Sequence, residues 1–176
     1  LLPLIAADEA TAVALGTEVI RTFPDRFEHF YRAGLQRKLG LSETLEGDAA
    51  LAQDLLTRMA ENAADFTLTF RRLGELADPS LQNDELVSGL FDDPGAFDQW
   101  ALRWRGRLAS DKRSSVERRS DMRSVSPAFI PRNHRIEQAI RQAVAGDLTV
   151  FRDLNVVLAK PFVEQPAYEQ YAEAPE

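Results

Sequence analysis

The feature that most constrains the fold is the spacing of apolar residues, which recur every three or four positions along nearly the whole chain. This is the period of an α-helix with one buried face. In the stretch PDRFEHFYRAGLQRKLGL, one apolar stripe carries Phe27, Phe30, Tyr31, Leu35 and Leu39. We find no convincing alternating run of the kind that indicates a β-strand, and no internal repeat. The sequence therefore predicts an all-α fold, an irregular multi-helix bundle.

Residues that start or end helices divide this pattern. Pro24 is expected to start a new helix, because the missing N–H of proline costs nothing in the first turn. Gly40 is expected to end that helix in a left-handed conformation. Asp48 and Asp65 precede apolar stripes, and each is expected to cap its helix with a side-chain oxygen.

We predict four parts along the chain. Residues 1–110 form a helical segment, and residues 111–125 form a basic connector. Residues 126–160 form a C-terminal pair of helices that is entered through a Pro-Arg-Asn turn and joined at Gly146. The Pro-, Glu- and Ala-rich residues 161–176 form an extended tail.

Composition places limits on function. The 176 residues suit one domain, or a compact domain with an appendage, that can bury a core. The formal net charge of -7 argues against general affinity for nucleic acid, which depends on Lys and Arg neutralising phosphates. The chain has no cysteine, which excludes disulfides, Cys-ligated zinc and thiol catalysis within it and fits a reducing compartment.

Neither a membrane span nor a signal peptide is expected in this sequence. No apolar run approaches the roughly 20 residues that span a bilayer, so we expect no membrane partner. The start, LLPLIAADEA, has neither an initiator Met nor a basic region before its apolar residues, so it does not resemble a signal peptide. We expect a piece of a longer protein that is located in the cytoplasm, or in the mitochondrial matrix if the source is eukaryotic, and is not secreted.

Few side chains suggest catalysis or metal binding. The two histidines, His29 and His134, lie far apart in sequence, and neither has a second ligand three or four residues away. Asp65-Phe66-Thr67 resembles the Asp-Phe-Gly of protein kinases, but the other kinase motifs are missing and a helix cap explains the Asp better. We expect no catalytic, cofactor-binding or metal-binding residue in this chain.

The segment Arg103–Arg123 is strongly basic, with eight Lys or Arg against three Asp or Glu. Such a segment is either a solvated connector or a surface that holds phosphate, an acidic partner or an acidic face of the same protein. Arg118 and Arg119 are the candidate contacts. One hypothesis is therefore a non-enzymatic helical module that binds an acidic partner protein.

The cluster Arg132-Asn133-His134-Arg135 lies where a loop enters a helix. Asn133 is expected to accept a hydrogen bond from the free N–H groups of that helix. Arg132 and Arg135 oppose the helix dipole there, which makes sense if they pair with carboxylates or bind an anion. The cluster is thus either a structural joint or an anion site.

The segment MRSVSPAFIPRNHRIEQAIRQAVAGDLTVFRDLNVVLAKPF, followed by YEQYAEAPE, resembles the C-terminal region of the selenoprotein-O-like family, also called YdiU. There the pattern is Met-x-x-Val-Asn-Pro-x-(Tyr/Phe)-(Ile/Val)-x-Arg-Asn, then a helix, Gly-Asp and a second helix. The matching residues are Met122, Val125, Pro127, Phe129, Ile130, Arg132 and Asn133. Ser126 stands where the family usually has Asn. FYRAGLQRKLGL and LLTRMAENAADFTLTFRRL are also similar to that family, so the likeness runs from Leu2 to Pro175.

This resemblance implies a kinase-like protein that binds ATP in a flipped orientation. Such a protein transfers AMP to Ser, Thr or Tyr hydroxyls of protein substrates. The ATP- and Mg-binding motifs of the family lie toward its N-terminus, and neither they nor the redox-active C-terminal Cys or selenocysteine occur here. The implied partners are the N-terminal kinase-like portion of the same protein and its protein substrates. In this setting Arg132 and Asn133 are expected to form a structural joint, with Arg132 paired to a carboxylate.

Overall fold

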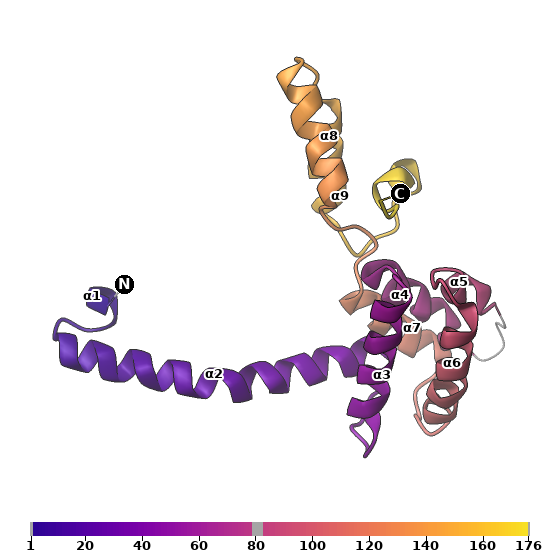
Figure 1. Cartoon of the computed structure of the whole chain (residues 1–176), viewed down its shortest axis with the longest axis horizontal. Coiled ribbons are helices and arrows are strands. Elements are labelled where there is room, and N and C mark those ends of the chain that lie inside the picture. The colour runs from indigo at the N-terminus through magenta and orange to yellow at the C-terminus, as the bar shows by residue number, and fades with distance from the viewer. Residues whose placement is uncertain (1, 79–82, 176) are drawn as a thin grey trace. The chain divides into compact units, whose positions relative to one another are not determined.

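The computed structural model describes residues 2–78 and 83–175, and within these ranges every regular element is a helix (Figure 1). In chain order the elements are α1 (Leu2–Ile5), α2 (Glu9–Lys38), α3 (Asp48–Glu61), α4 (Phe66–Leu73), the 3₁₀ helix η1 (Gly74–Ala77), α5 (Glu85–Ser88), α6 (Pro94–Leu108), α7 (Ser115–Val125), α8 (Asn133–Val144), α9 (Thr149–Leu158) and the 3₁₀ helix η2 (Pro166–Tyr171). The all-α prediction is confirmed. Among the described helices, none is long and apolar enough to cross a membrane.

The chain divides into two compact units, Leu1–Leu35 and Gln36–Glu176. The boundary predicted between residues 110 and 111 is therefore not the boundary that the packing gives. The predicted connector over 111–125 is also wrong, because most of it is the helix α7. The predicted extended tail over 161–176 contains η2, so it is wrong for that stretch.

The first unit consists of α1 and most of α2. Asp8 starts α2, and its carboxylate accepts hydrogen bonds from the Thr11 backbone N at 2.8 Å and from the Thr11 hydroxyl at 2.7 Å. Pro24 lies inside α2, so the prediction of a new helix there is wrong. The fixed φ of proline suits a helix, and the loss of one backbone hydrogen bond does not end a helix of 30 residues.

The second unit begins at the end of α2, where Gly40 has a φ of 72° as predicted. The Gly40 N donates to the Arg37 carbonyl and the Leu41 N donates to the Gln36 carbonyl, both at 3.0 Å. This pair of bonds is a Schellman motif, which satisfies carbonyls that the helix itself leaves free. The remaining Leu39 carbonyl accepts from the indole N–H of Trp104 at 2.8 Å.

Two tryptophans of α6 form the centre of the core of the second unit. Trp100 and Trp104 have no exposed surface, and their rings stack with centroids 5.6 Å apart. Trp100 donates its indole N–H to the Leu51 carbonyl of α3 at 2.9 Å. Each ring thus buries a large apolar area while its one polar group stays hydrogen-bonded. The two donors join α6 to α3 and to the end of α2.

Side-chain caps account for several helix starts. Asp65 accepts from the Leu68 N at 2.8 Å and caps α4 as predicted. Asp48 does not cap α3, because Gly47 occupies the cap position and Asp48 is already the first helical residue. Its carboxylate instead accepts from the Leu45 N and pairs with Arg107 of α6.

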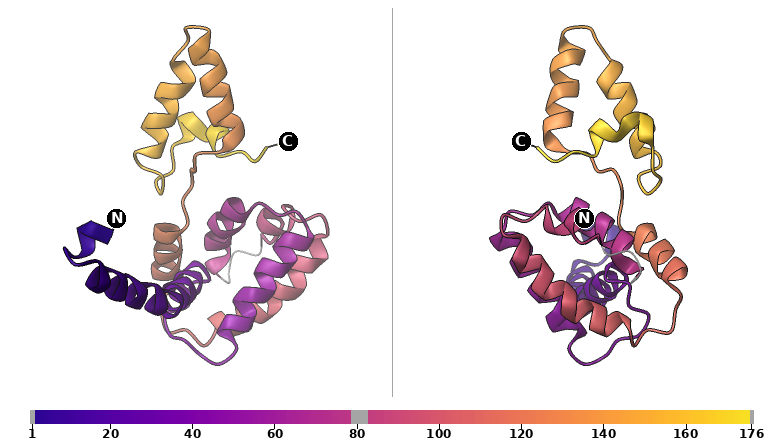
Figure 2. Two further views of the ribbon diagram at one scale, coloured as in Figure 1. Left: turned by 60° about the vertical axis from the view of Figure 1, so that its left-hand side comes forward. Right: turned by 90° about the vertical axis from the view of Figure 1, so that its right-hand side faces the viewer.

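The C-terminal part of the second unit is a hairpin of α8 and α9, with η2 packed beside them (Figure 2). Gly146, with a φ of 92°, makes the turn between the two helices. The hairpin has a small core of its own that is closed by η2. This core contains Ala128, Phe129, Ala139, Val150, Leu154, Val157 and Tyr171.

The contrast between Gly40 and Gly47 predicts different costs for the same substitution. Both have positive φ, which costs a non-glycine residue about 1–2 kcal/mol. A Cβ on Gly40 would also lie 2.7 Å from the Met122 sulfur and 2.8 Å from the Arg118 Cγ, whereas nothing lies within 4 Å at Gly47. We expect Gly40→Ala to lower the free energy of unfolding by about 2–5 kcal/mol, since overpacking adds roughly 1–3 kcal/mol. Gly47→Ala should cost only the backbone part, and equal losses in urea unfolding would contradict the close packing of α7 on Gly40.

Candidate functional site

The basic residues that the sequence singles out lie on α7 and at the start of α8. α7 begins with a capping box, in which the Ser114 hydroxyl accepts from the Glu117 N and the Glu117 carboxylate accepts from the Ser114 N. This reciprocal pair satisfies two free donors at the helix start. A Ser followed three residues later by Glu is visible in the sequence, so the helix could have been recognised there.

Arg118 is the most enclosed cation of α7, with only 4% of the residue exposed. Its guanidinium donates to the Ala77 carbonyl at 3.1 Å, the Arg113 carbonyl at 3.2 Å and the Leu108 carbonyl at 3.4 Å. Ala77 and Leu108 are the last residues of η1 and α6, where carbonyls lack partners within the helix. Arg118 therefore closes two helix ends and cannot reach a partner protein.

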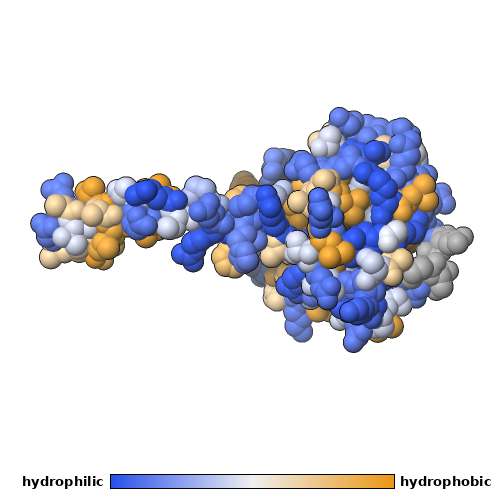
Figure 3. Space-filling model, turned by 90° about the horizontal axis from the view of Figure 1, so that it is seen from below, coloured by the Kyte–Doolittle hydropathy of each residue, from blue (hydrophilic) through white to orange (hydrophobic). Residues whose placement is uncertain are grey.

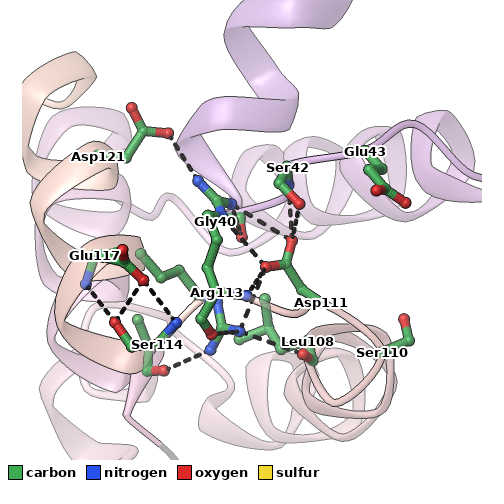
Figure 4. A network of polar contacts seen from close by, with 12 residues as sticks. Gly40, Ser42, Glu43, Leu108, Ser110, Asp111, Arg113, Ser114, Glu117 and Asp121 are labelled. Carbon is green, nitrogen blue, oxygen red and sulfur yellow. Dashed lines mark hydrogen bonds and ion pairs between the residues drawn. The ribbon is translucent and has the colours of Figure 1, made fainter.

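Asp111 lies beside Arg118, 3.7 Å from its guanidinium, and is the centre of a polar network (Figure 4). Its carboxylate accepts from the Ser42 N at 2.8 Å, the Ser42 hydroxyl at 2.7 Å and the Arg113 N at 3.0 Å. Burial alone raises the pKa of Asp111, but the hydrogen bonds from Ser42 and Arg113 outweigh it and hold the pKa far below the usual value. Arg113 also donates to the Gly40 carbonyl at 2.7 Å, so the network joins the end of α2 to the start of α7.

The remaining arginines of the basic stretch are paired as well. Arg119 and Arg123 share the carboxylate of Glu75 in η1. All seven arginines from Arg103 to Arg123 have a carboxylate of the same chain within 4 Å, and these residues are Arg103, Arg105, Arg107, Arg113, Arg118, Arg119 and Arg123. Of the two alternatives for this stretch, the structure thus supports an intramolecular role.

Arg132 pairs with Asp65, the residue that caps α4. Two guanidinium nitrogens of Arg132 lie 2.7 and 3.3 Å from the two carboxylate oxygens of Asp65. The Arg132 side chain is 6% exposed and the Asp65 side chain 18% exposed. Burial raises the pKa of Asp65, but the hydrogen bonds from Arg132 and Leu68 outweigh it and lower the pKa. One carboxylate thus caps α4 and anchors the turn before α8.

Asn133 does not cap α8, which corrects the prediction. Arg132 occupies the cap position in an extended conformation, and α8 has no side-chain cap. Asn133 is already the first helical residue and is exposed, so its side chain lies one position too late to reach the free N–H groups.

Arg135 connects α8 to the tail. It donates to the Gln170 carbonyl at 2.6 Å and pairs with Glu173 at 3.0 Å, and its guanidinium lies 5.8 Å from the centre of the Tyr171 ring. The Tyr171 hydroxyl donates to Asp153 of α9 at 2.9 Å. Burial, together with the neighbouring Asp153, raises the pKa of Tyr171. These contacts hold η2 against the helical hairpin.

Sequence reasoning missed Arg71 of α4. The Arg71 side chain is 9% exposed. Its guanidinium pairs with Glu164 of the tail and donates to the Ser126 carbonyl at 2.9 Å. Arg71 lines a groove of about 570 Å³ between α4, α7 and the tail. The groove also holds the paired Arg123 and Glu75. No sequence signal marks Arg71, because its carboxylate partner lies 93 residues away.

Metal ligands do not gather in the part of the chain that the structure describes. Within residues 2–78 and 83–175, no group of three or more His, Cys, Asp or Glu side chains could hold a metal ion. The described side chains named above are joined to one another through arginine–carboxylate pairs and helix-end carbonyls. These pairs and carbonyl contacts join α4 to α8, and α6 to α7, as described above.

Arg118 and Arg119 are neighbours in sequence but should respond differently to truncation. Arg118→Ala removes the buried guanidinium that donates to the Ala77 and Arg113 carbonyls. An unsatisfied buried acceptor costs about 1–3 kcal/mol, so we expect a loss of about 2–5 kcal/mol in the free energy of unfolding. Arg119 is 41% exposed as a side chain, and Arg119→Ala should cost no more than about 1 kcal/mol. Urea unfolding of the two variants provides the measurement. Equal, small losses would mean that Arg118 is not a buried structural cation.

The pair Arg132–Asp65 should make stability depend on pH. The pKa of Asp65 is lowered in the folded chain, so its contribution is present above about pH 4, the ordinary value, and is lost as the pH falls through the lowered pKa. Asp65→Asn keeps a capping oxygen but removes the charge, and we expect it to cost roughly 1–3 kcal/mol at pH 7. The difference in melting temperature from the wild type should shrink below pH 4.

Asn133→Ala serves as the control and should change stability by no more than about 0.5 kcal/mol at any pH, because its side chain is exposed. A difference between the wild type and Asp65→Asn that stays constant from pH 7 to pH 3 would contradict the ionic role of Asp65.

Comparison with known proteins gives the family. The family model described as protein adenylyltransferase SelO matches residues 4–159. Proteins named protein nucleotidyltransferase YdiU are similar to the chain: the one from Nitrobacter winogradskyi is 54% identical over 99% of this chain and 34% of its own length. The one from Bradyrhizobium diazoefficiens is 48% identical over 99% of this chain and 35% of its own length. The one from Methylorubrum extorquens is 50% identical over 100% of this chain and 37% of its own length. The chain thus spans about a third of the length of these relatives. With most of its residues inside the family model and about half of them identical in these relatives, the chain belongs to the SelO family.

Proposed function

We propose that this chain is the C-terminal helical portion of a protein adenylyltransferase, which transfers AMP from ATP to Ser, Thr or Tyr hydroxyls of proteins. In this proposal the chain supports the catalytic core and supplies no catalytic residue. The observation that carries the proposal is the match to the SelO family over residues 4–159, combined with a coverage of about a third of the relatives.

The contacts of the basic residues support a scaffolding role. Arg118 and Arg132 are almost fully buried and are bound to groups of the same chain. A buried guanidinium that already has its partners offers no free charge to the phosphates of a nucleotide. ATP and Mg²⁺ would then be bound by the part of the full-length protein outside residues 1–176.

The alternative of an independent module that docks an acidic partner has less support. It depends on Arg118 and Arg119 being available to that partner. Arg118 is enclosed by helix ends, and Arg119 is paired with Glu75. The charge of this stretch is thus largely neutralised within the chain.

Labelled ATP tests the proposal directly. With Mg²⁺ present, the full-length protein should attach labelled AMP to itself or to added proteins, whereas residues 1–176 alone should neither bind nucleotide nor label proteins. A full-length protein that binds ATP but transfers no AMP would contradict the proposed activity. Saturable binding of nucleotide by residues 1–176 would contradict the division of roles.

A further inference from the structure

Within the described residues of the first unit, α2 has an apolar face whose large side chains are exposed. Its large side chains recur at helical spacing, and each is at least 41% exposed. They are Val13, Leu15, Val19, Ile20, Phe23, Phe27, Phe30 and Tyr31. From Val13 to Tyr31 the face is about 27 Å long, at 1.5 Å per residue. Apolar residues appear along this helix in Figure 3 as orange surface beside blue hydrophilic residues.

The face is ordered as one strip. Successive aromatic rings stack along it, with centroids 5.9 Å apart for Phe23 and Phe27 and 5.7 Å apart for Phe27 and Tyr31. The charged residues lie mainly on the other side of the helix, where Arg32 pairs with Glu28. A contiguous apolar strip with a charged back is typical of a helix that packs against another surface.

We propose that the apolar strip of α2 is covered by the portion of the full-length polypeptide that lies outside residues 1–176. This inference rests on the part of the proposed function that makes the chain a portion of a longer protein, and not on AMP transfer. The relatives match this chain over nearly all of its length, while about two thirds of their own length lies outside the match. A covalently linked segment has an effective concentration on the order of millimolar, so it outcompetes a second molecule at lower concentration.

The charge of the first unit argues against a membrane surface as the occupant. Residues 1–35 contain five Asp or Glu and three Arg, which gives a net charge of -2. Helices that lie on membranes typically have a polar face rich in Lys and Arg, which is attracted to anionic lipids. The strip of α2 lacks that basic flank and suits an apolar protein surface.

The absence of cysteine from residues 1–176 provides a probe of this interface. Phe27→Cys places a thiol on the strip, and Ala14→Cys places one at an exposed position on the opposite side of the helix. Reaction with a maleimide is followed by mass spectrometry of the α2 peptide, in residues 1–176 alone and in the full-length protein. In residues 1–176 alone both positions should react at similar rates.

In the full-length protein, Phe27→Cys should react at least about tenfold more slowly than Ala14→Cys, because reaction then requires local opening of the interface. Equal rates in the full-length protein would overturn the proposal. Slow reaction of Phe27→Cys in residues 1–176 alone would also overturn it: protection that grows with protein concentration would indicate a second copy, and constant protection would indicate cover from this chain itself.

Ile20→Glu and Ala14→Glu give a second measurement that needs no thiol. In the full-length protein Ile20→Glu should lower the melting temperature and Ala14→Glu should leave it nearly unchanged, while equal effects would contradict the proposal. Neither readout depends on AMP transfer. Protection without AMP transfer would refute only the proposed activity, and AMP transfer without protection would refute only this interface.

Discussion

The buried guanidinium of Arg118 is the interaction on which the packing of the second unit depends. It lies where η1 ends, where α6 ends and where the loop before α7 turns, and it donates to a carbonyl of each. A cation is favoured there because helix C-termini carry partial negative charge and unpaired carbonyls. The close approach of its side chain also requires a residue without Cβ at Gly40. The Arg118 side chain of α7 therefore contacts the end of α2, the end of α6 and the end of η1.

The arrangement around Arg118 explains why a basic segment occurs in an acidic protein. The guanidinium groups of α6 and α7 face carboxylates on α3, η1 and the connecting loops, such as Asp48, Glu75 and Asp111. A partly buried ion pair is costly to break, because removal of one partner leaves the other unpaired. These pairs therefore specify which helix lies against which, while the two tryptophans of α6 are the largest fully buried side chains among the described residues.

Sequence reasoning succeeded where structure is a local property. The apolar spacing predicted helices, Gly40 and Gly146 were residue types suited to positive φ, and Asp65 was a good cap. The prediction of a new helix at Pro24 was wrong, because a helix of 30 residues tolerates the loss of one backbone hydrogen bond. The predicted cap at Asn133 was wrong by one position, because Arg132 occupies the N-cap of α8.

The candidate site depended on contacts that are distant in sequence. Asp65 lies 67 residues from Arg132, and the Ala77 carbonyl lies 41 residues from Arg118. The pattern at the start of α8 suggested that its arginines need carboxylates, but nothing local identified which ones. A charge run alone likewise could not distinguish a solvated connector from α7, whose arginines are mostly directed toward carboxylates of the chain.

The two units differ in how their charged and apolar side chains are satisfied. In the second unit, the buried charged groups that the structure describes have partners within the chain, as Arg132 has Asp65. In the first unit, large apolar groups such as Ile20 and Phe30 remain in water, at 73% and 66% exposure. A polar group that is buried without a hydrogen-bond partner costs several kcal/mol of folding free energy, so it needs that partner within the fold. An exposed apolar side chain costs less free energy, because only its contact with water is unfavourable. The first unit thus exposes apolar surface to water, whereas the buried charges of the second unit already have their partners.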